Sequence, residues 1–531
     1  MPAALLQIGE DYWENIEIDK DDIQSLAAHL FEIEQPLELE ELSKVLVRYR
    51  INKIEQSAKK NQSDTGKFYY PRDNYQVGDI LSFPHLNWVK GIVEGTRPGN
   101  NPELGEFQVL SVKMQDGQIE SFAAGLKEHA LNAKDYESAI SDVLNPDQIL
   151  ANHHKEINAK LGFALQNQKD LVRIGLSWFP KSLLLEINQG HLNLAEAFLD
   201  SREGGPITIE ELLDQLEIKN VESKQLLEFS MNYALQEDPR FDEVGTSGVF
   251  SWFLRRLEPK SVLEVPETLQ VPEIIDLPDG LSTSTLRMLE ELDDEFCPPD
   301  GVLSKQEKSA SVSVTLTYPH WRVGSLPLSA QSSRVFPSAI FTDHIKIAFI
   351  DSQTNETISA WVVRPGRYVI GLKEWYESQN LIPGSIIELS STLDPGVINI
   401  SAQKKRSNKE WIKTVLFGAD GGLVIALLRQ SIYAGFSDRM AIAVTDVNTM
   451  DQIWKDRKPK NIQLKTDTIR MVNELSKLNQ QRHVHFVDLY ASLNLIRRVP
   501  PQNLLHVLMN NPEFLHVGDN YYHLVDTSQT E

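Results

Sequence analysis

Residues 204–257 constrain the fold of this chain more strongly than any other stretch of its sequence. Thr208 and Glu211 stand at the spacing of a capping box, which predicts that a helix begins just after Thr208. A second helix is predicted over residues 223–236, because its apolar residues form one wide face. Residues 241–253 then resemble two short strands around a turn that contains glycine, which indicates a β-hairpin.

Helices followed by a short hairpin are the pattern of a winged helix, and parts of this pattern occur at both ends of the chain. After Gln35-Pro36, residues 37–42 repeat the helix start of the central stretch. Residues 511–518 repeat the order of Pro, Phe and Val-Gly that residues 238–245 contain. The sequence therefore predicts three modules: a partial winged-helix-like helical module with an acidic arm at 1–60, a winged helix at 204–257 and a C-terminal winged helix at 465–526.

These motifs resemble the HARE-HTH winged-helix family, which occurs in the delta subunit of bacterial RNA polymerase, in chromatin regulators and beside restriction nucleases. The resemblance covers residues 206–253 and 488–524, and residues 26–50 in part. It implies association with nucleic acid or with a polymerase, without catalysis. Residues 361–389, which contain Leu-Ile-Pro-Gly-Ser-Ile-Ile-Glu-Leu at 381–389, are similar to the DNA-binding pseudobarrels of plant transcription factors and some restriction enzymes.

The rest of the chain predicts further domains, as its 531 residues require. Several short strands separated by turn residues predict a small barrel of the SH3-like or OB-like kind. The expected fold class is α+β multidomain, with winged-helix modules joined to SH3/OB-like and pseudobarrel-like β-rich regions. The remaining boundaries are 66–130 for the small β-barrel, 131–203 for a helical connector, 258–314 for a Pro-rich acidic linker and 315–450 for a β-rich domain.

The composition is that of a soluble protein with several cores. With 41% hydrophobic and 24% charged residues, and no apolar run that could cross a bilayer, we expect a cytoplasmic protein without a membrane partner. The net charge of −23 disfavours strong non-specific binding to nucleic acid but is compatible with a local basic face. Cys297 is the only cysteine, which excludes an internal disulfide and a Cys-rich zinc site.

Basic residues in three places are the candidates for contacts with phosphates. They are Arg48 and Arg50 in the first module, Arg255 and Arg256 after the central hairpin, and Lys404, Lys405 and Arg406 in a run close to Trp411. Each set also fits a simpler interpretation, namely a solvated strand end or an exposed loop.

No motif of a known catalytic class occurs, and we expect neither an enzyme nor a cofactor. His483 and His485 alternate near Asp488, but a metal site needs a third ligand that the local sequence lacks, so no metal site is predicted. Residues 290–295 form a carboxylate cluster, and such clusters are usually solvated.

Two functions remain open. The first is a non-enzymatic protein that associates with double-stranded DNA or with the transcription machinery, such as RNA polymerase, through its winged helices. The alternative is an acidic scaffold for protein–protein interactions that binds no nucleic acid, which the net charge favours.

Overall fold

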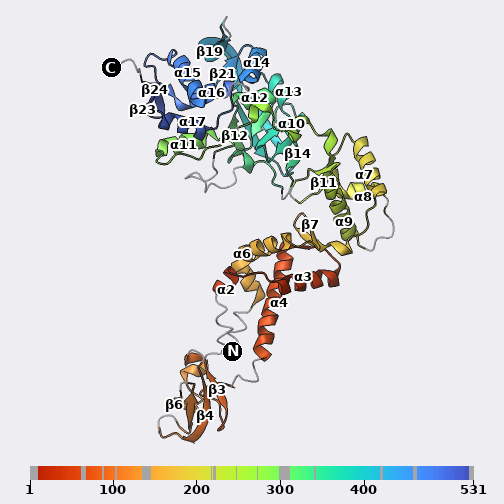
Figure 1. Ribbon diagram of the computed structural model, residues 1–531, viewed down its shortest axis with the longest axis vertical. Helices are drawn as coiled ribbons and strands as arrows, with labels where there is room; N and C mark the ends of the chain where they lie inside the picture. Colours follow the sequence, from red (N-terminus) through yellow and green to blue (C-terminus); the bar gives the residue numbers. More distant parts are fainter. Residues whose placement is uncertain are drawn as a thin grey trace. The chain divides into compact units, whose positions relative to one another are not determined.

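The computed structural model describes residues 10–60, 67–86, 89–101, 105–115, 117–133, 145–216, 218, 223–246, 248–271, 273–297, 311–339, 342–418, 422–457 and 463–525. The chain divides into two units, one made of residues 1–187 and 220–233 and the other of residues 188–219 and 234–531. Both contain helices and sheets (Figure 1), which confirms the α+β multidomain class. None of the helices in the described ranges combines the length and the apolar character that a bilayer crossing requires.

Three helices and three strands of the first unit form one module. In chain order they are α3 (Lys20–Ile33), β1 (Leu37–Glu38), α4 (Leu39–Lys60), α6 (Pro146–Gln166), β7 (Leu171–Ile174) and β8 (Ser177–Pro180), preceded by α2 (Glu10–Glu14). The carboxylate of Asp19 accepts the backbone N–H of Asp22, and the carboxylate of Asp22 accepts that of Asp19, so α3 begins with a capping box. Leu26, Leu42 and Leu161, one from each helix, meet in a buried core.

A separate five-stranded sheet interrupts this module between α4 and α6. Its strands follow one another in chain order: β2 (Lys67–Phe68), β3 (Ile80–Phe83), β4 (Val89–Pro98), β5 (Gln108–Met114) and β6 (Ile119–Ala124). In its core Phe83 stacks on Phe122, and Tyr69 packs against both rings. The strands lie within the range predicted for the small barrel.

The predicted connector at 131–203 is not a connector throughout. Its residues 146–180 supply α6, β7 and β8, and β8 pairs with β1 through Trp178 and Leu37. These strands complete the module that the sequence predicted only in part. Strand partners so distant in the chain leave no local pattern, which is why the sequence showed only the first part of the module.

The central module contains the two helices and the hairpin predicted for it: α8 (Ile209–Leu216), α9 (Lys224–Glu237), β10 (Phe241–Glu243) and β11 (Ser251–Leu254). It also contains β9 (Ile207–Thr208), which was not predicted, and α7 (Gln189–Ser201), which lies in the range predicted as a connector. The hydroxyl of Thr208 accepts the N–H of Glu211 at 3.3 Å, as the capping-box spacing predicted. Strand β11 lies between β9 and β10.

The segment predicted as a linker at 258–314 is partly folded. It contains α10 (Lys260–Leu263) and α11 (Thr283–Leu292), and two short 3-10 turns, Arg255–Leu257 and Glu267–Leu269, lie before and after α10. Leu269 and Met288 are buried. Pro259 and Pro266 stand at the N-caps of α10 and of the turn Glu267–Leu269, and the segment folds because Val262 and Leu269 are buried in cores. Residues 298–310 lie outside the described part.

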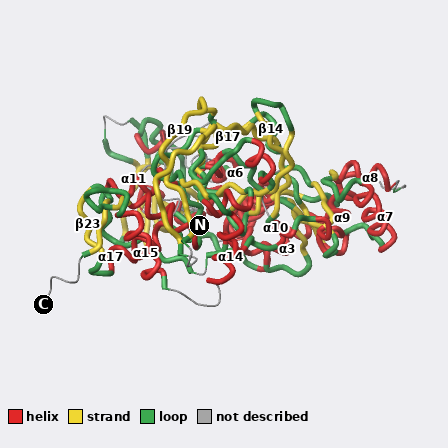
Figure 2. The backbone as a smooth tube through the Cα atoms, turned by 90° about the horizontal axis from the view of Figure 1, so that it is seen from above, coloured by secondary structure: helices red, strands yellow, loops and turns green. Residues whose placement is uncertain are grey.

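A seven-stranded sheet forms the centre of the second unit (Figure 2). Across the sheet the strands are β12 (Ser311–Thr315), β17 (Ile386–Ser391), β18 (Val397–Ala402), β14 (His344–Asp351), β15 (Thr357–Val363), β16 (Tyr368–Ile370) and β13 (Ser325–Pro327). Neighbours are antiparallel except β14 and β18. The helices α12 (Tyr318–Val323) and α13 (Lys373–Ser378) lie between strands in the chain.

A long hairpin and a third module follow. The hairpin pairs β19 (Lys404–Phe417) with β20 (Leu423–Ala434), and β21 (Ile442–Val444) joins β19 in parallel. The remaining elements are α14 (Val447–Arg457), α15 (Leu464–Ser476), β22 (Val484–His485), α16 (Phe486–Ile496), α17 (Pro501–Asn510), β23 (Phe514–Gly518) and β24 (Tyr521–Leu524).

The three modules share one order of elements and one sheet topology. Each runs helix, strand, helix, helix, strand, strand, and in each sheet the last strand lies between the other two: β1-β8-β7, β9-β11-β10 and β22-β24-β23. The third helices are therefore α6, α9 and α17.

Candidate functional site

Two of the arginines predicted to contact phosphates are engaged within the protein. The Arg50 guanidinium lies against the buried carboxylate of Asp22, with Nε 2.6 Å from Oδ1, and also donates to Tyr12. Arg256 pairs with Asp200 and Glu196. The Arg50 charge is thus balanced inside its module, whereas 53% of the Arg256 side chain remains exposed. Contact of either residue with phosphate stays a prediction.

The other predicted cations differ in their surroundings. Arg48 on α4 and Arg255 are exposed, and Lys404 is exposed at the start of β19. Lys405 and Arg406 belong to the same strand, but their side chains lie outside the described part.

The third helices of two modules are covered by other parts of their own unit. In the first half of α9, Phe229 packs edge-to-face on Phe179 at 5.8 Å, and the Ser230 hydroxyl accepts the N–H of Leu185. In α17, the amide side chain of Asn503 donates to the Glu273 carbonyl at 2.8 Å.

An open groove lies beside the third helix of the first module. It has a volume of about 1560 Å³ and runs between α3 and α6. Ile23, Ala27 and Phe31 recur four residues apart along one face of α3, and Ala159 and Phe163 do so on α6. Phe163 is 72% exposed and Phe31 is 47% exposed. The two helices thus present facing apolar stripes to solvent.

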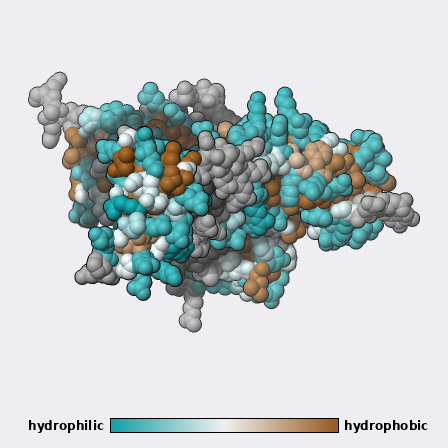
Figure 3. All heavy atoms as spheres, turned by 90° about the horizontal axis from the view of Figure 1, so that it is seen from below, coloured by the Kyte–Doolittle hydropathy of each residue, from teal (hydrophilic) through white to brown (hydrophobic). Residues whose placement is uncertain are grey.

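The charged residues that line this groove are balanced in number. Three are acidic, Glu17, Asp19 and Asp170, and three are basic, Lys20, Lys160 and Lys181. On the face drawn in Figure 3, apolar residues reach the surface in groups among hydrophilic ones. Scattered apolar side chains are normal on soluble proteins, whereas facing stripes along a groove are typical of an interaction surface.

A smaller polar pocket of about 320 Å³ lies beside the third module. At its wall, Lys413 Nζ is 2.5 Å from Asp488 Oδ1, and Arg439 bridges Asp488 Oδ2 and the Tyr521 hydroxyl at 3.1 and 3.0 Å. His485 lies edge-on to the Tyr521 ring at 4.9 Å. Sequence reasoning considered His485 near Asp488 only as part of a metal site and rejected that site, and it had no signal for Lys413 or Arg439.

The two histidines that were considered together have separate structural roles. His483 stacks on His523 with ring centroids 5.8 Å apart. Nδ1 of His485 accepts the N–H of Val487 and caps α16. Burial and the nearby charges of Arg439 and Lys413 lower the pKa of His485 to about 4, despite the opposing charge of Asp488. His485 is therefore neutral at pH 7.

We expect acid to destabilise the protein through His485. Its pKa is about 6.5 when unfolded and about 4 when folded, so the unfolded chain binds the extra proton between these values and stability falls as the pH drops through this range. Because the ring is partly exposed, we expect a loss of about 1–2 kcal/mol.

His485→Asn, which keeps a capping acceptor, tests this expectation. The difference in urea-unfolding free energy between about pH 7 and about pH 4.5 is expected to shrink in this variant. His154→Asn, a substitution at an exposed position on α6, should leave this pH-dependent difference in unfolding free energy unchanged. An equal pH dependence in the wild type and His485→Asn would contradict the assignment.

One further group of side chains could hold a cation. Among the described residues, Asp242, Glu258 and His344 place one ligand atom each within 4.8 Å of one another. No signal in the local sequence connects them, because each lies in a different segment.

No protein-family model, no curated protein and no solved structure matches the chain.

Proposed function

We propose that this protein is a non-enzymatic scaffold that binds partner proteins, and that its three repeated modules are winged helices. The shared order of elements and the central position of the last strand in each sheet support the winged-helix assignment. The single observation that carries the function is the exposed apolar groove between α3 and α6.

The surroundings of the third helices favour proteins over DNA as partners. A winged helix that reads DNA places its third helix in the major groove. In α9 and α17 this helix is packed against other segments of the same unit. On α6, Lys155 and Lys160 are offset by Asp147 and Glu156, so the helix lacks the net positive charge that binds phosphates.

The groove fits an amphipathic helix of a partner protein. Helix-in-groove recognition uses apolar anchors at helical spacing, and the stripes on α3 and α6 offer a surface for such anchors. The volume of about 1560 Å³ exceeds the range of roughly 300–1,000 Å³ that is usual for small-molecule sites. With balanced charges at its edges, the groove would gain affinity mainly from apolar burial.

Charge substitutions in the groove test this proposal. Phe31→Glu and Phe163→Glu are each expected to remove a common set of bound proteins when the full chain is purified with its partners from its own cells, with losses of at least about tenfold. Leu194→Glu, at a position that is 57% exposed on α7, is the matched control and should retain the set. Retention by all three variants would contradict the proposal.

A second candidate function is nucleic-acid binding at the β19–β20 hairpin, alone or with RNA polymerase. Trp411 is 64% exposed, and the guanidinium of Arg429 lies 5.8 Å from its ring centre. An exposed aromatic ring beside cations is the usual platform for a stacked base.

Fluorescence anisotropy with duplex and single-stranded DNA at about 50 and about 200 mM salt separates the two functions. The scaffold proposal expects no salt-dependent binding. Binding that weakens with salt and is lost in a Lys404→Glu, Lys409→Glu double variant would favour the second candidate instead.

A further inference from the structure

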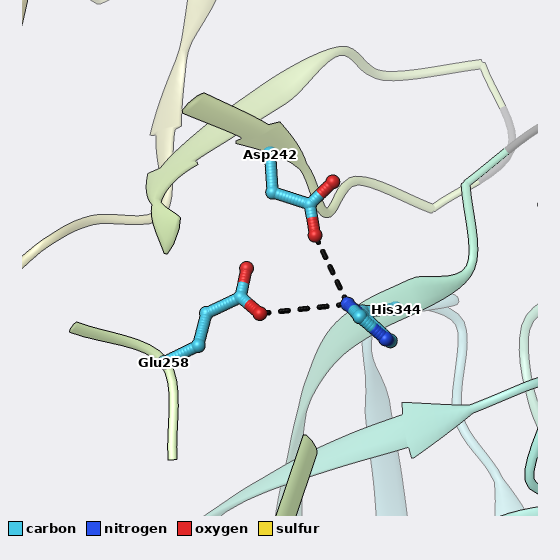
Figure 4. A group of neighbouring side chains, drawn as sticks. All are labelled: Asp242, Glu258 and His344. Carbon is cyan, nitrogen blue, oxygen red and sulfur yellow. Dashed lines mark hydrogen bonds and ion pairs between the residues drawn. The ribbon is translucent and has the colours of Figure 1, made fainter. Parts of the chain in front are cut away.

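Three side chains from separate segments converge where the central module meets the seven-stranded sheet (Figure 4). Asp242 comes from β10, Glu258 follows the turn after β11, and His344 opens β14. Nδ1 of His344 is 3.0 Å from Asp242 Oδ2 and 3.4 Å from Glu258 Oε2. Both carboxylates thus point at the same ring nitrogen.

These separations suit ligands that share one metal ion. Tetrahedral zinc, with bonds of about 2.0–2.1 Å to nitrogen and oxygen, sets its ligand atoms about 3.3 Å apart. By contrast, a single N–H at Nδ1 can make only one well-directed hydrogen bond, so the histidine alone satisfies one carboxylate and not both.

Glu258 supplies an independent indication of a missing partner. Its side chain is 0% exposed, and neither carboxylate oxygen has a hydrogen bond. A buried carboxylate without hydrogen bonds is costly, and proteins normally satisfy such groups by pairing or by metal coordination. The nearby ammonium of Lys346 lies over the Trp361 ring at 4.4 Å and makes no ion pair with Glu258 within the described contacts.

We propose that Asp242, Glu258 and His344 bind a divalent transition-metal ion, with Zn²⁺ as the best match. Imidazole favours zinc over magnesium and calcium, and two carboxylates balance the two positive charges of the ion. With three protein ligands, a water molecule would complete the tetrahedron on the side of Asp242, the most exposed of the three at 24%.

The ion would join two parts of the second unit that already touch. The backbone N–H of Lys346 donates to the Val244 carbonyl at 2.9 Å, and Val244 and Phe253 share a core with Trp361 and Tyr368. The proposed role is therefore structural: the ion would hold β10 and β14 together. This inference does not depend on the groove between α3 and α6.

Metal analysis of the full-length protein tests the proposal. Metals are first removed with a chelator and Zn²⁺ is then added. Elemental analysis is expected to find about one zinc more per chain in the wild type than in Glu258→Gln or Asp242→Asn. Zinc is also expected to raise the melting temperature of the wild type and not of these variants.

One control variant and one alternative measurement keep the result decisive. The double variant His483→Gln, His523→Gln removes the stacked histidine pair, which could take up zinc adventitiously, and should keep the specific ion. Should a ligand variant fail to fold, the visible spectrum of the Co²⁺-loaded wild type serves instead, since tetrahedral coordination gives strong bands. A wild type that takes up no zinc, zinc that persists in both carboxylate variants, or the absence of tetrahedral Co²⁺ bands would overturn the proposal.

Discussion

Replacing Arg498 with methionine is expected to lower the free energy of unfolding by about 3–5 kcal/mol. The guanidinium is fully buried and lies 2.6 Å from Asp294 Oδ2 and 2.7 Å from Glu295 Oε1. Without it, two adjacent carboxylates would remain buried. The Tyr490 hydroxyl donates to Asp294, and His320 lies 3.2 Å from Glu295, but each of these groups contacts one carboxylate, whereas Arg498 contacts both.

Urea unfolding followed by tryptophan fluorescence measures this loss. Lys477→Met is the matched control, because Lys477 is 61% exposed in its pair with Glu474. This substitution should lower the free energy of unfolding by less than about 1 kcal/mol. The triple variant Asp294→Asn, Glu295→Gln, Arg498→Met is expected to recover part of the loss, since it removes the uncompensated charge. An Arg498→Met protein as stable as the wild type would show that the charge of Arg498 does not stabilise the folded protein.

Replacing Trp361 with alanine is expected to cost about 3–5 kcal/mol. Trp361 on β15 is 3% exposed, meets Phe253 edge-to-face at 5.0 Å, and lies beneath the Lys346 ammonium. Its removal leaves a cavity in the core that joins the central module to the seven-stranded sheet.

Chemical unfolding compared with Trp411→Ala checks this expectation. Trp411 is exposed, so its substitution should change stability by no more than about 0.5 kcal/mol. Limited proteolysis is expected to cut Trp361→Ala between residues 244 and 270 sooner than the wild type, because that segment loses its packing partner. Equal cleavage of the two proteins would indicate that other contacts hold this segment.

The candidate sites were only partly predictable from the sequence. His483 and His485 alternate near Asp488, but without a third ligand in the local sequence no site was predicted there. Lys413, which completes the ion pair with Asp488, is too far along the chain to be found by spacing. Arg50 shows the same limit, since its ion-pair partner Asp22 lies on another helix and no local pattern reveals it.

The carboxylates at 290–295 illustrate the same limit. Acidic clusters are usually solvated, and the sequence alone predicted this for the whole run. Asp294 and Glu295 are instead buried, at 3% and 6% exposure, because Arg498 reaches them from a distant segment. A local pattern cannot report a charge partner about two hundred residues away.

The sequence by itself determined the local elements of the protein: the start of α8 after Thr208, the extent of α9 and the hairpins of the central and C-terminal modules. Caps, apolar periodicity and turn residues act within a few residues of one another, so they can be recognised without a fold. Only the tertiary structure decided that β8 completes the first module, that the groove between α3 and α6 is open, and that Asp242, Glu258 and His344 meet. These features depend on which distant segments bury one another, and that depends on packing throughout each unit.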